Sequence, residues 1–232
     1  TGSVTKFAKY HHGDASMNDT IIRMGQDFIG ANNIPILDRE GQFGTRNQLG
    51  NDAPAPRYIG ACLSKITRLI FPKIDDKLLE LRLEDNEPVE PISYVPIIPM
   101  LLVNGAIGIG TGWNTRIPQF NPKQLIGIVA KMLRGIPKVK CAEHLMPYYE
   151  GFRGSIYEDE KQWIFDGNVK CLDMKTIKVN PDSAYSYEIQ AGRTFIIDEI
   201  PIGRSVEQFR ERLNKLVGDK KIVDYSNLVN SK

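Results

Sequence analysis

Two closely spaced prolines near the start of residues 51–70, NDAPAPRYIGACLSKITRLI, restrict the backbone strongly. A residue that precedes a proline is kept out of the helical region, so Pro54 and Pro56 hold the approach extended. Apolar residues then recur with a helical period, which predicts a helix over residues 59–70. The apolar positions are Ile59, Cys62, Leu63, Ile66, Leu69 and Ile70. Pro72 is expected to end this helix.

Tyr58 would begin the predicted helix, with Arg57 beside it. The first turn of a helix has unpaired N–H groups and the positive end of the dipole, which favour an anion. A phenol is a poor nucleophile at neutral pH unless a cation or a base favours the phenolate, and a guanidinium can also grip two phosphate oxygens. The pair therefore suits attack on a phosphodiester. The plainer alternative, a packed tyrosine beside a surface arginine, stays open on these two residues alone.

Four uncommon strings occur in one order: AKYHHGDAS at 8–16, GQFGTR at 41–46, PRYI at 56–59 and PIIPMLLVNGAIGIGTGW at 96–113. Together they closely resemble the DNA breakage-reunion region of type IIA DNA topoisomerases, in the eukaryotic-type topoisomerase II branch. The resemblance is strong over the first half of the chain and weaker beyond. A bacterial-type gyrase or topoisomerase IV A subunit shares the tyrosine but differs around the His-His-Gly and GTGW strings.

The resemblance implies an α+β protein in two parts. A winged-helix (helix-turn-helix) domain over residues 1–113 would carry the tyrosine, and a β-rich, tower-like α/β domain would follow over residues 114–232. The chain begins Thr1-Gly2-Ser3, without an initiator methionine, so we expect a piece of a longer protein, truncated at both ends.

The first residues support a helix-turn-helix. Residues 1–9 are interpreted as the end of a helix, followed by a polar turn. Ser16 and Asp19 have the spacing of a capping box, which predicts a second helix running to about Ile29. Its apolar face would contain Met17, Ile21, Met24 and Phe28, with Gly30 as the stop.

Composition limits the possible partners and the cellular environment of this chain. The net charge of the 232 residues is only +2, so any DNA contact must be a local patch. Cys62, Cys141 and Cys171 are scattered and fit neither a disulfide framework nor a CxxC metal site, which predicts a reducing, intracellular environment. No apolar run reaches the roughly 20 residues of a membrane span, so a soluble protein without a membrane partner is expected. The resemblance implies the nucleus for a cellular eukaryotic enzyme, otherwise a viral or cytoplasmic replication site.

Two polar segments are candidates for phosphate contact. His11 and His12 can each donate a hydrogen bond to phosphate, although exposed turn histidines are the plainer reading. The resemblance places His12 near the scissile phosphate. In the second segment, residues 41–46, glycines permit close backbone approach beside phosphate-binding side chains; an ordinary surface loop is the alternative. The assigned DNA-binding residues are Tyr10, His11, Ser16, Gln42, Thr45, Arg46 and Ile109.

Residues 104–113, NGAIGIGTGW, are rich in glycine but lack the spacing of a nucleotide-binding loop. An apolar residue on such a turn can wedge between base steps and kink a duplex. The resemblance gives this role to Ile109. Eukaryotic enzymes commonly carry an acidic residue where this chain has Ile107. The alternative, that Ile107 and Ile109 are core residues of a strand, remains open.

The rest of the chain is interpreted mostly as scaffold. Strands are expected over residues 78–83 and 94–103, and Asn121-Pro122 begins a helix that ends at Gly135. Its inward residues would be Leu125, Ile126, Val129, Met132 and Leu133. Short strands follow over residues 152–158, 163–165, 176–179, 185–189 and 194–200. Ser205 and Gln208 then cap a last helix with Phe209, Leu213 and Leu216 inward. The family's Arg-Thr-Trp after Pro201 is replaced here by Gly203-Arg204-Ser205.

The expected activity, implied by the resemblance together with this chemistry, is that of an ATP-dependent DNA topoisomerase II. Tyr58 would attack a backbone phosphate of double-stranded DNA, with Arg57 and His12 stabilising it, and form a reversible 5′-phosphotyrosyl link. Cutting both strands implies a homodimer. No clustered carboxylate signature for Mg²⁺ is found here. The resemblance places the Mg²⁺ ligands in a preceding domain and the ATP site farther upstream. The rival interpretation is a winged-helix DNA-binding module without catalysis.

Overall fold

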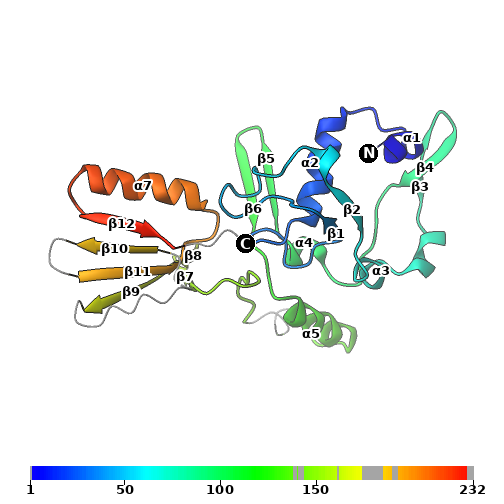
Figure 1. Ribbon diagram of the computed structural model, residues 1–232. Coiled ribbons are helices and arrows are strands. Elements are labelled where there is room, and N and C mark those ends of the chain that lie inside the picture. The colour runs from blue at the N-terminus through cyan, green and yellow to red at the C-terminus, as the bar shows by residue number, and fades with distance from the viewer. Residues whose placement is uncertain are drawn as a thin grey trace. The chain divides into compact units, whose positions relative to one another are not determined.

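The computed structural model describes residues 2–137, 140, 144–160, 162–173, 185–189 and 193–228. They form two compact units, the first of residues 1–45 and 50–149, the second of residues 46–49 and 150–232 (Figure 1). The predicted mixed α+β class is confirmed. The division falls after Tyr149 rather than after residue 113, because Leu125 packs into the core of the first unit.

The first unit combines short helices with three two-stranded antiparallel sheets, β1–β2, β3–β4 and β5–β6. Its elements are α1 (Gly2–Ala8), α2 (Asp14–Gly25), β1 (Leu37–Glu40), η1 (Pro56–Tyr58), β2 (Gly60–Leu63), α3 (Thr67–Ile70), η2 (Lys73–Lys77), β3 (Leu81–Glu84), β4 (Glu87–Pro91), α4 (Met100–Val103), β5 (Ala106–Gly110), β6 (Trp113–Ile117) and α5 (Pro122–Leu133). Ile70, Ile98, Val103 and Leu125 form its buried cluster.

The second unit has a hairpin, β7–β8, and a four-stranded antiparallel sheet in the order β12-β10-β11-β9. Its elements are β7 (Ser155–Asp159), β8 (Gln162–Asp166), β9 (Asn168–Asp173), β10 (Tyr185–Ile189), β11 (Arg193–Glu199), α7 (Val206–Gly218) and β12 (Asp224–Asn227). The predicted capping box of α7 is confirmed. The Ser205 side chain accepts a hydrogen bond from the backbone N–H of Gln208, and the Gln208 side chain accepts one from the backbone N–H of Ser205. Leu213 on α7 packs with Ile197, Ile200 and Ile222, and the expected inward residues Phe209 and Leu216 flank this cluster.

The helix predicted over residues 59–70 is wrong. Residues 60–63 form β2, which pairs with β1 from Glu40↔Gly60 to Leu37↔Leu63, and only Thr67–Ile70 are helical. Tyr58 therefore ends a 3₁₀ turn instead of beginning a helix, so the argument from an N-terminal dipole does not apply. The segment was ambiguous, because a short apolar run fits a strand or a helix and long-range pairing decides between them.

Helix α2 also differs from its prediction at both ends. It begins at Asp14, after Gly13, without a side-chain cap, so Ser16 and Asp19 do not form the expected capping box. It ends at Gly25 rather than near residue 29. The amide of Asn32 donates to the carbonyls of Arg23 and Gln26, at 2.7 and 2.8 Å, and holds the chain as it turns away.

Three further predictions need correction. Residues 94–99 form no strand, since Pro96 and Pro99 interrupt the segment before α4. On α5, Ile126 and Leu133 are 52% and 84% exposed and do not face inward. Strands β3, β7, β8, β10 and β11 overlap their predicted ranges, whereas the missed strands, besides β2, are β1, β4, β5, β6, β9 and β12. The strand predicted over 176–179 lies outside the described residues.

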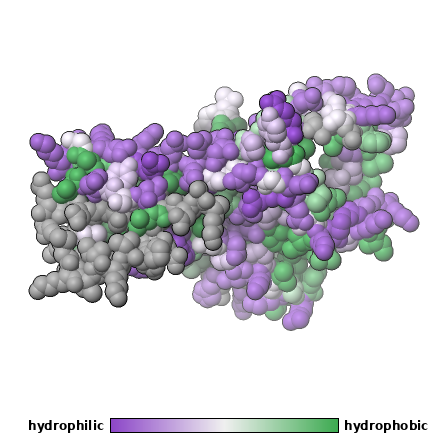
Figure 2. Space-filling view, viewed as in Figure 1, coloured by the Kyte–Doolittle hydropathy of each residue, from purple (hydrophilic) through white to green (hydrophobic). Residues whose placement is uncertain are grey.

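Exposed apolar side chains are frequent in the first unit. Figure 2 shows such surface, in green, among mainly hydrophilic side chains. Examples are Ile74, Leu78, Val95, Ile109 and Trp113, each more than two-thirds exposed. Apolar exposure on this scale is typical of a surface that other macromolecules contact.

Candidate functional site

Tyr58 lies at the surface, at the end of η1 and just before β2, and is 69% exposed. The guanidinium carbon of Arg57 lies 4.9 Å from the centre of the Tyr58 ring, which is a cation–π contact. The phenol oxygen is therefore accessible to a large substrate, with a fixed positive charge beside the ring.

The 3₁₀ turn holds Tyr58 by backbone contacts. Its N–H donates to the carbonyl of Ala55 at 3.0 Å, and the N–H of Ile59 donates to the carbonyl of Pro56 at 3.3 Å. Pro56 is suited to the first position of such a turn because its φ is already fixed. The two prolines therefore do order the approach to Tyr58, as the sequence predicted.

The loop that follows β1 lies against this turn. Gly41 has φ +96°, and a Cβ there would come within 3.0 Å of the Ile59 side chain and 3.6 Å of the Tyr58 carbonyl oxygen. Farther along, Phe43 is almost fully buried, and its carbonyl accepts from the side chain of Gln26 at 2.9 Å. The loop start is thus packed beside the candidate nucleophile. Gln42 is exposed and accepts from Arg39 at 3.3 Å.

The histidine turn joins α1 to α2. Tyr10 and His12 make an edge-to-face contact, with ring centres 5.4 Å apart. His11 Nε2 lies 3.2 Å from a carboxylate oxygen of Glu84 on β3. Both histidines are exposed. The ring contacts thus group Tyr10 with His12 and Arg57 with Tyr58 as two separate pairs.

Lys9 anchors the same turn to the β3–β4 hairpin. Its ammonium lies 2.9 Å from Glu87 and 3.7 Å from Asp85, and it donates to the Glu84 carbonyl at 3.2 Å. The hydrogen bond with Glu87 raises the pKa of Lys9 and lowers the pKa of Glu87 from their ordinary values. Lys9 adopts φ +43°, an uncommon backbone for lysine that these contacts stabilise.

Two residues of the candidate DNA-binding set are already engaged by other groups. The Thr45 N–H and hydroxyl both donate to Asp52, the former at 2.7 Å. Arg46 is ion-paired with Glu199 and donates to the Ile200 carbonyl at 2.6 Å. The Arg46 side chain is only 16% exposed and that of Glu199 only 1%. The structure thus places Arg46 in a buried ion pair, which no sequence signal indicated.

Ile109 lies on the β5–β6 hairpin, which projects from the region of α4 as a two-stranded ribbon (Figure 1). Thr111 and Gly112 form its two-residue turn, and Gly112 has φ +82° as a tight turn requires. Ile109 is 86% exposed and Ile107 is 67% exposed. The alternative that they are core residues of a strand is therefore excluded. Trp113, at 85% exposed, was not among the predicted site residues.

Three side-chain amides hold the base of this hairpin. Asn33 donates to the carbonyls of Val103 and Phe120, which flank the hairpin, at 3.0 and 3.2 Å. Asn104 pairs with the backbone N–H and carbonyl of Ile34, both at 2.9 Å. Gln119 donates to Ala31. No sequence signal pointed to these contacts, because they join residues more than 65 positions apart.

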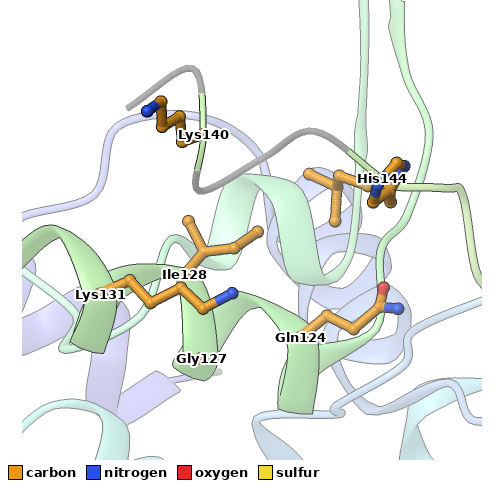
Figure 3. A pocket seen from close by; sticks show the side chains of 7 residues that line it. Gln124, Gly127, Ile128, Lys131, Lys140 and His144 are labelled. Atoms are coloured by element: carbon orange, nitrogen blue, oxygen red, sulfur yellow. The ribbon is translucent and has the colours of Figure 1, made fainter. Parts of the chain in front are cut away.

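A separate pocket of about 440 Å³ lies beside α5 (Figure 3). Gln124, Ile128 and Lys131 of α5 line one side, and Lys140 and His144 come from the segment that follows. None of the predicted site residues lines it. Among the residues that the structure describes, no group of three His, Cys, Asp or Glu side chains is arranged to hold a metal ion. Nor does any described helix have the length and apolar character to cross a membrane.

Comparison with known proteins defines the class of protein to which this chain is similar. The family model for the A subunit of DNA gyrase/topoisomerase IV matches residues 1–232. In the solved structures, the chain is similar to the Plasmodium falciparum topoisomerase II DNA-binding, cleavage and re-ligation domain. The TM-score is 0.79 and the identity 35%, over 95% of this chain and 27% of that one.

The curated relatives are eukaryotic. DNA topoisomerase 2 top-2 of Caenorhabditis elegans is 40% identical over 97% of this chain, and DNA topoisomerase 2-beta of Gallus gallus is 42% identical over 77%. The chain spans 14% and 11% of their lengths. This chain belongs to the family of DNA gyrase/topoisomerase IV A subunits, and the predicted resemblance to type IIA topoisomerases, in the eukaryotic-type branch, is confirmed.

Proposed function

We propose that this chain supplies the DNA-cleaving tyrosine of a type II DNA topoisomerase, and that Tyr58 is that residue. The observation that carries the proposal is the exposed Tyr58 phenol beside Arg57, in a chain whose whole length matches the family model. A nucleophile that must reach a phosphate within a duplex has to lie at the surface on an ordered support. The 3₁₀ turn and β2 supply that support.

The reaction is a reversible transesterification. The Tyr58 oxygen attacks a backbone phosphorus and loses its proton, a tyrosyl–phosphorus bond forms, and the bond to the 3′-oxygen breaks. The freed 3′-oxygen takes up a proton as a hydroxyl. The same hydroxyl attacks the phosphotyrosine to reseal the strand, so the phosphodiester energy is retained. Arg57 would move from the Tyr58 ring to the phosphate as negative charge develops.

Other residues would hold the duplex. We infer that His12 stabilises the reacting phosphate, while Tyr10, His11, Ser16, Gln42 and Thr45 contact the DNA backbone. The exposed His11, His12, Ser16 and Gln42 support this assignment. Arg46 is better explained as a structural residue because its guanidinium is occupied by Glu199. Ile109 would wedge between base steps from the tip of its hairpin, consistent with its 86% exposure.

The two units would correspond to the winged-helix and tower-like parts. In the first, α1, α2 and the β1–β2 pair have the order expected of a helix-turn-helix with a wing. We infer a homodimer, because two tyrosines are needed to cut both strands, and action in the nucleus of a eukaryotic cell. Mg²⁺ and ATP would be bound by other domains of the protein, as the family resemblance implies.

Covalent capture tests the proposal. The intact protein is incubated with supercoiled plasmid and Mg²⁺, quenched with denaturant and digested with protease. Wild type is expected to yield linear DNA with a tyrosyl peptide on its 5′ ends, and Tyr58→Phe none, with unchanged DNA affinity. Tyr94→Phe, at a 55% exposed tyrosine of the same unit, is the matched control and should cleave normally. If Tyr58→Phe still cleaves, or wild type binds without a covalent link, the non-catalytic winged-helix module replaces the enzyme.

A further inference from the structure

The β5–β6 hairpin has two chemically different faces. Directly opposed residues of an antiparallel pair share a face, and successive residues alternate between faces. The register pairs Ile107 with Arg116 and Ile109 with Asn114. One face, here called the isoleucine face, therefore consists of Ile107, Ile109, Asn114 and Arg116. The opposite face consists of Gly108, Gly110, Trp113 and Thr115.

Neither face is covered by the described residues. All of the isoleucine face is exposed, and a Cβ added at Gly108 would meet no atom within 4 Å. No described carboxylate forms an ion pair with Arg116. An isolated two-stranded hairpin is only marginally stable in water, so exposed isoleucines and an unpaired cation indicate a partner that covers them.

The spacing of the two isoleucines along β5 is close to the depth of the minor groove of duplex DNA. Ile109 is next to the tip, whereas Ile107 and its partner Arg116 lie two residues farther back. Two residues of a strand span about 6.8 Å, and the minor groove is about 7.5 Å deep. When Ile109 reaches the base edges, the second pair therefore lies at the rim of the groove, where deoxyribose and phosphates are.

We propose that Arg116 binds a phosphate at the rim of the minor groove, and that Ile107 packs against the adjoining deoxyribose, while Ile109 enters the base stack. This inference rests on the proposed function, because it takes duplex DNA as the partner and Ile109 as the wedge. On the opposite face, Gly108 and Gly110 let the backbone of β5 approach the groove closely, whereas Trp113 on β6 presents a large, exposed side chain. Charge complementarity favours DNA: the only formal charge on the isoleucine face is the cation of Arg116.

The salt dependence of DNA binding tests the role of Arg116. Affinity for a short duplex is measured between 50 and 200 mM salt, with intact protein in a Tyr58→Phe background and without Mg²⁺, so that cleavage never enters. Losing one phosphate contact lowers the slope of log affinity against log salt by about 0.9 per protomer, which is about 3.5-fold over this range. Arg116→Ala should show this loss, and Arg116→Lys should retain the wild-type slope.

Two further variants test the face. Ile107→Glu puts a carboxylate beside phosphate, and should weaken binding about fivefold at the lowest salt and less as salt rises. Thr115→Ala, on the opposite face of the same strand, should change neither affinity nor slope. An unchanged slope for Arg116→Ala, or an equal change for Thr115→Ala, would overturn the inference and leave the isoleucine face to a protein partner. If wild type fails to bind duplex DNA at all, the proposed function falls with it.

Discussion

Replacing Arg46 is expected mainly to lower the stability of the second unit, with a smaller effect on DNA affinity. The Glu199 carboxylate is almost fully buried and accepts from Arg46, from the Ile200 N–H at 3.0 Å and from the Arg153 N–H at 3.2 Å. Arg46→Ala removes the only cation in this set and leaves a buried charge with two backbone donors. Removing one partner of a buried ion pair typically costs about 3–5 kcal/mol.

Native-state hydrogen exchange of the intact protein measures this cost locally. A loss of about 3 kcal/mol increases the exchange of protected β11 amides on the order of 100-fold, where exchange reports the opening equilibrium. The double variant Arg46→Ala/Glu199→Gln should recover part of the loss, because the buried group is then neutral. Lys170→Ala is the control: its ion pair with Asp198 has a 61% exposed lysine side chain, and such pairs contribute about 0–1 kcal/mol.

The opposite result would refute the reasoning. If Arg46→Ala left β11 exchange unchanged but reduced DNA affinity and its salt slope, Arg46 would act as a phosphate ligand and the buried pair would contribute little. The α7 helix gives an internal check. In its first turn, the Val206 N–H donates to the Arg46 carbonyl at 3.4 Å and the Glu207 N–H donates to the Asn47 carbonyl at 3.2 Å. Hydrogen exchange at these two amides should therefore rise together with that of the β11 amides.

Three other predictions concern the supports of the site. Asn33→Ala leaves three backbone carbonyls without their amide donor, so we expect a loss of about 1–3 kcal/mol, measured by hydrogen exchange around the base of the β5–β6 hairpin. Ser205→Ala removes the N-cap of α7 and should cost about 1 kcal/mol, measured by exchange within the helix; Ser205→Asp should retain most of it. The Lys9–Glu87 pair predicts a pH window. Because the pKa of Glu87 is lowered in the folded protein, the pair stabilises the folded state at pH values above the unfolded pKa of 4.5. This stabilisation is lost as the pH falls through the folded pKa of Glu87. Because the pKa of Lys9 is raised in the folded protein, its charge stabilises the folded state at pH values below the unfolded pKa of 10.5. This stabilisation is lost as the pH rises through the folded pKa of Lys9. Protection of α1 should therefore be greatest between these limits, and Lys9→Ala should flatten the profile.

Signals that are local in the chain were predicted correctly. The Ser205 and Gln208 capping box, the Asn121-Pro122 start of α5 and the extended approach to Tyr58 each depend on neighbours within one turn. In α5, for example, the Asn121 side chain accepts from the Lys123 N–H at 2.9 Å. Such contacts depend on neighbouring residues, so residue types can identify them, although the same reasoning failed for Ser16 and Asp19 at the start of α2.

Long-range contacts account for the errors. Residues 60–63 became a strand because β1 offered a pairing edge 20 to 26 residues earlier in the chain. Helix α2 ended early because Asn32 binds its last carbonyls. Arg46 was assigned to DNA from its residue type, and its ion pair with Glu199, 153 positions away, was not predicted. In each case the residue type was compatible with both outcomes, and only the tertiary partner decided between them.

The reach of Ile109 depends on residues that have no reactive chemistry. Its hairpin is exposed along its length, so its direction is set at the base, where Asn104 pairs with Ile34 and Asn33 holds Val103 and Phe120. Gly105 is required there as well, since it has φ +69° and a Cβ would come within 2.7 Å of the Ile117 carbonyl oxygen. A wedging side chain can kink a duplex only if the hairpin that carries it keeps its position. In the proposed function, the amide contacts at the base would therefore be as necessary to DNA bending as Ile109 itself, although no motif identifies them.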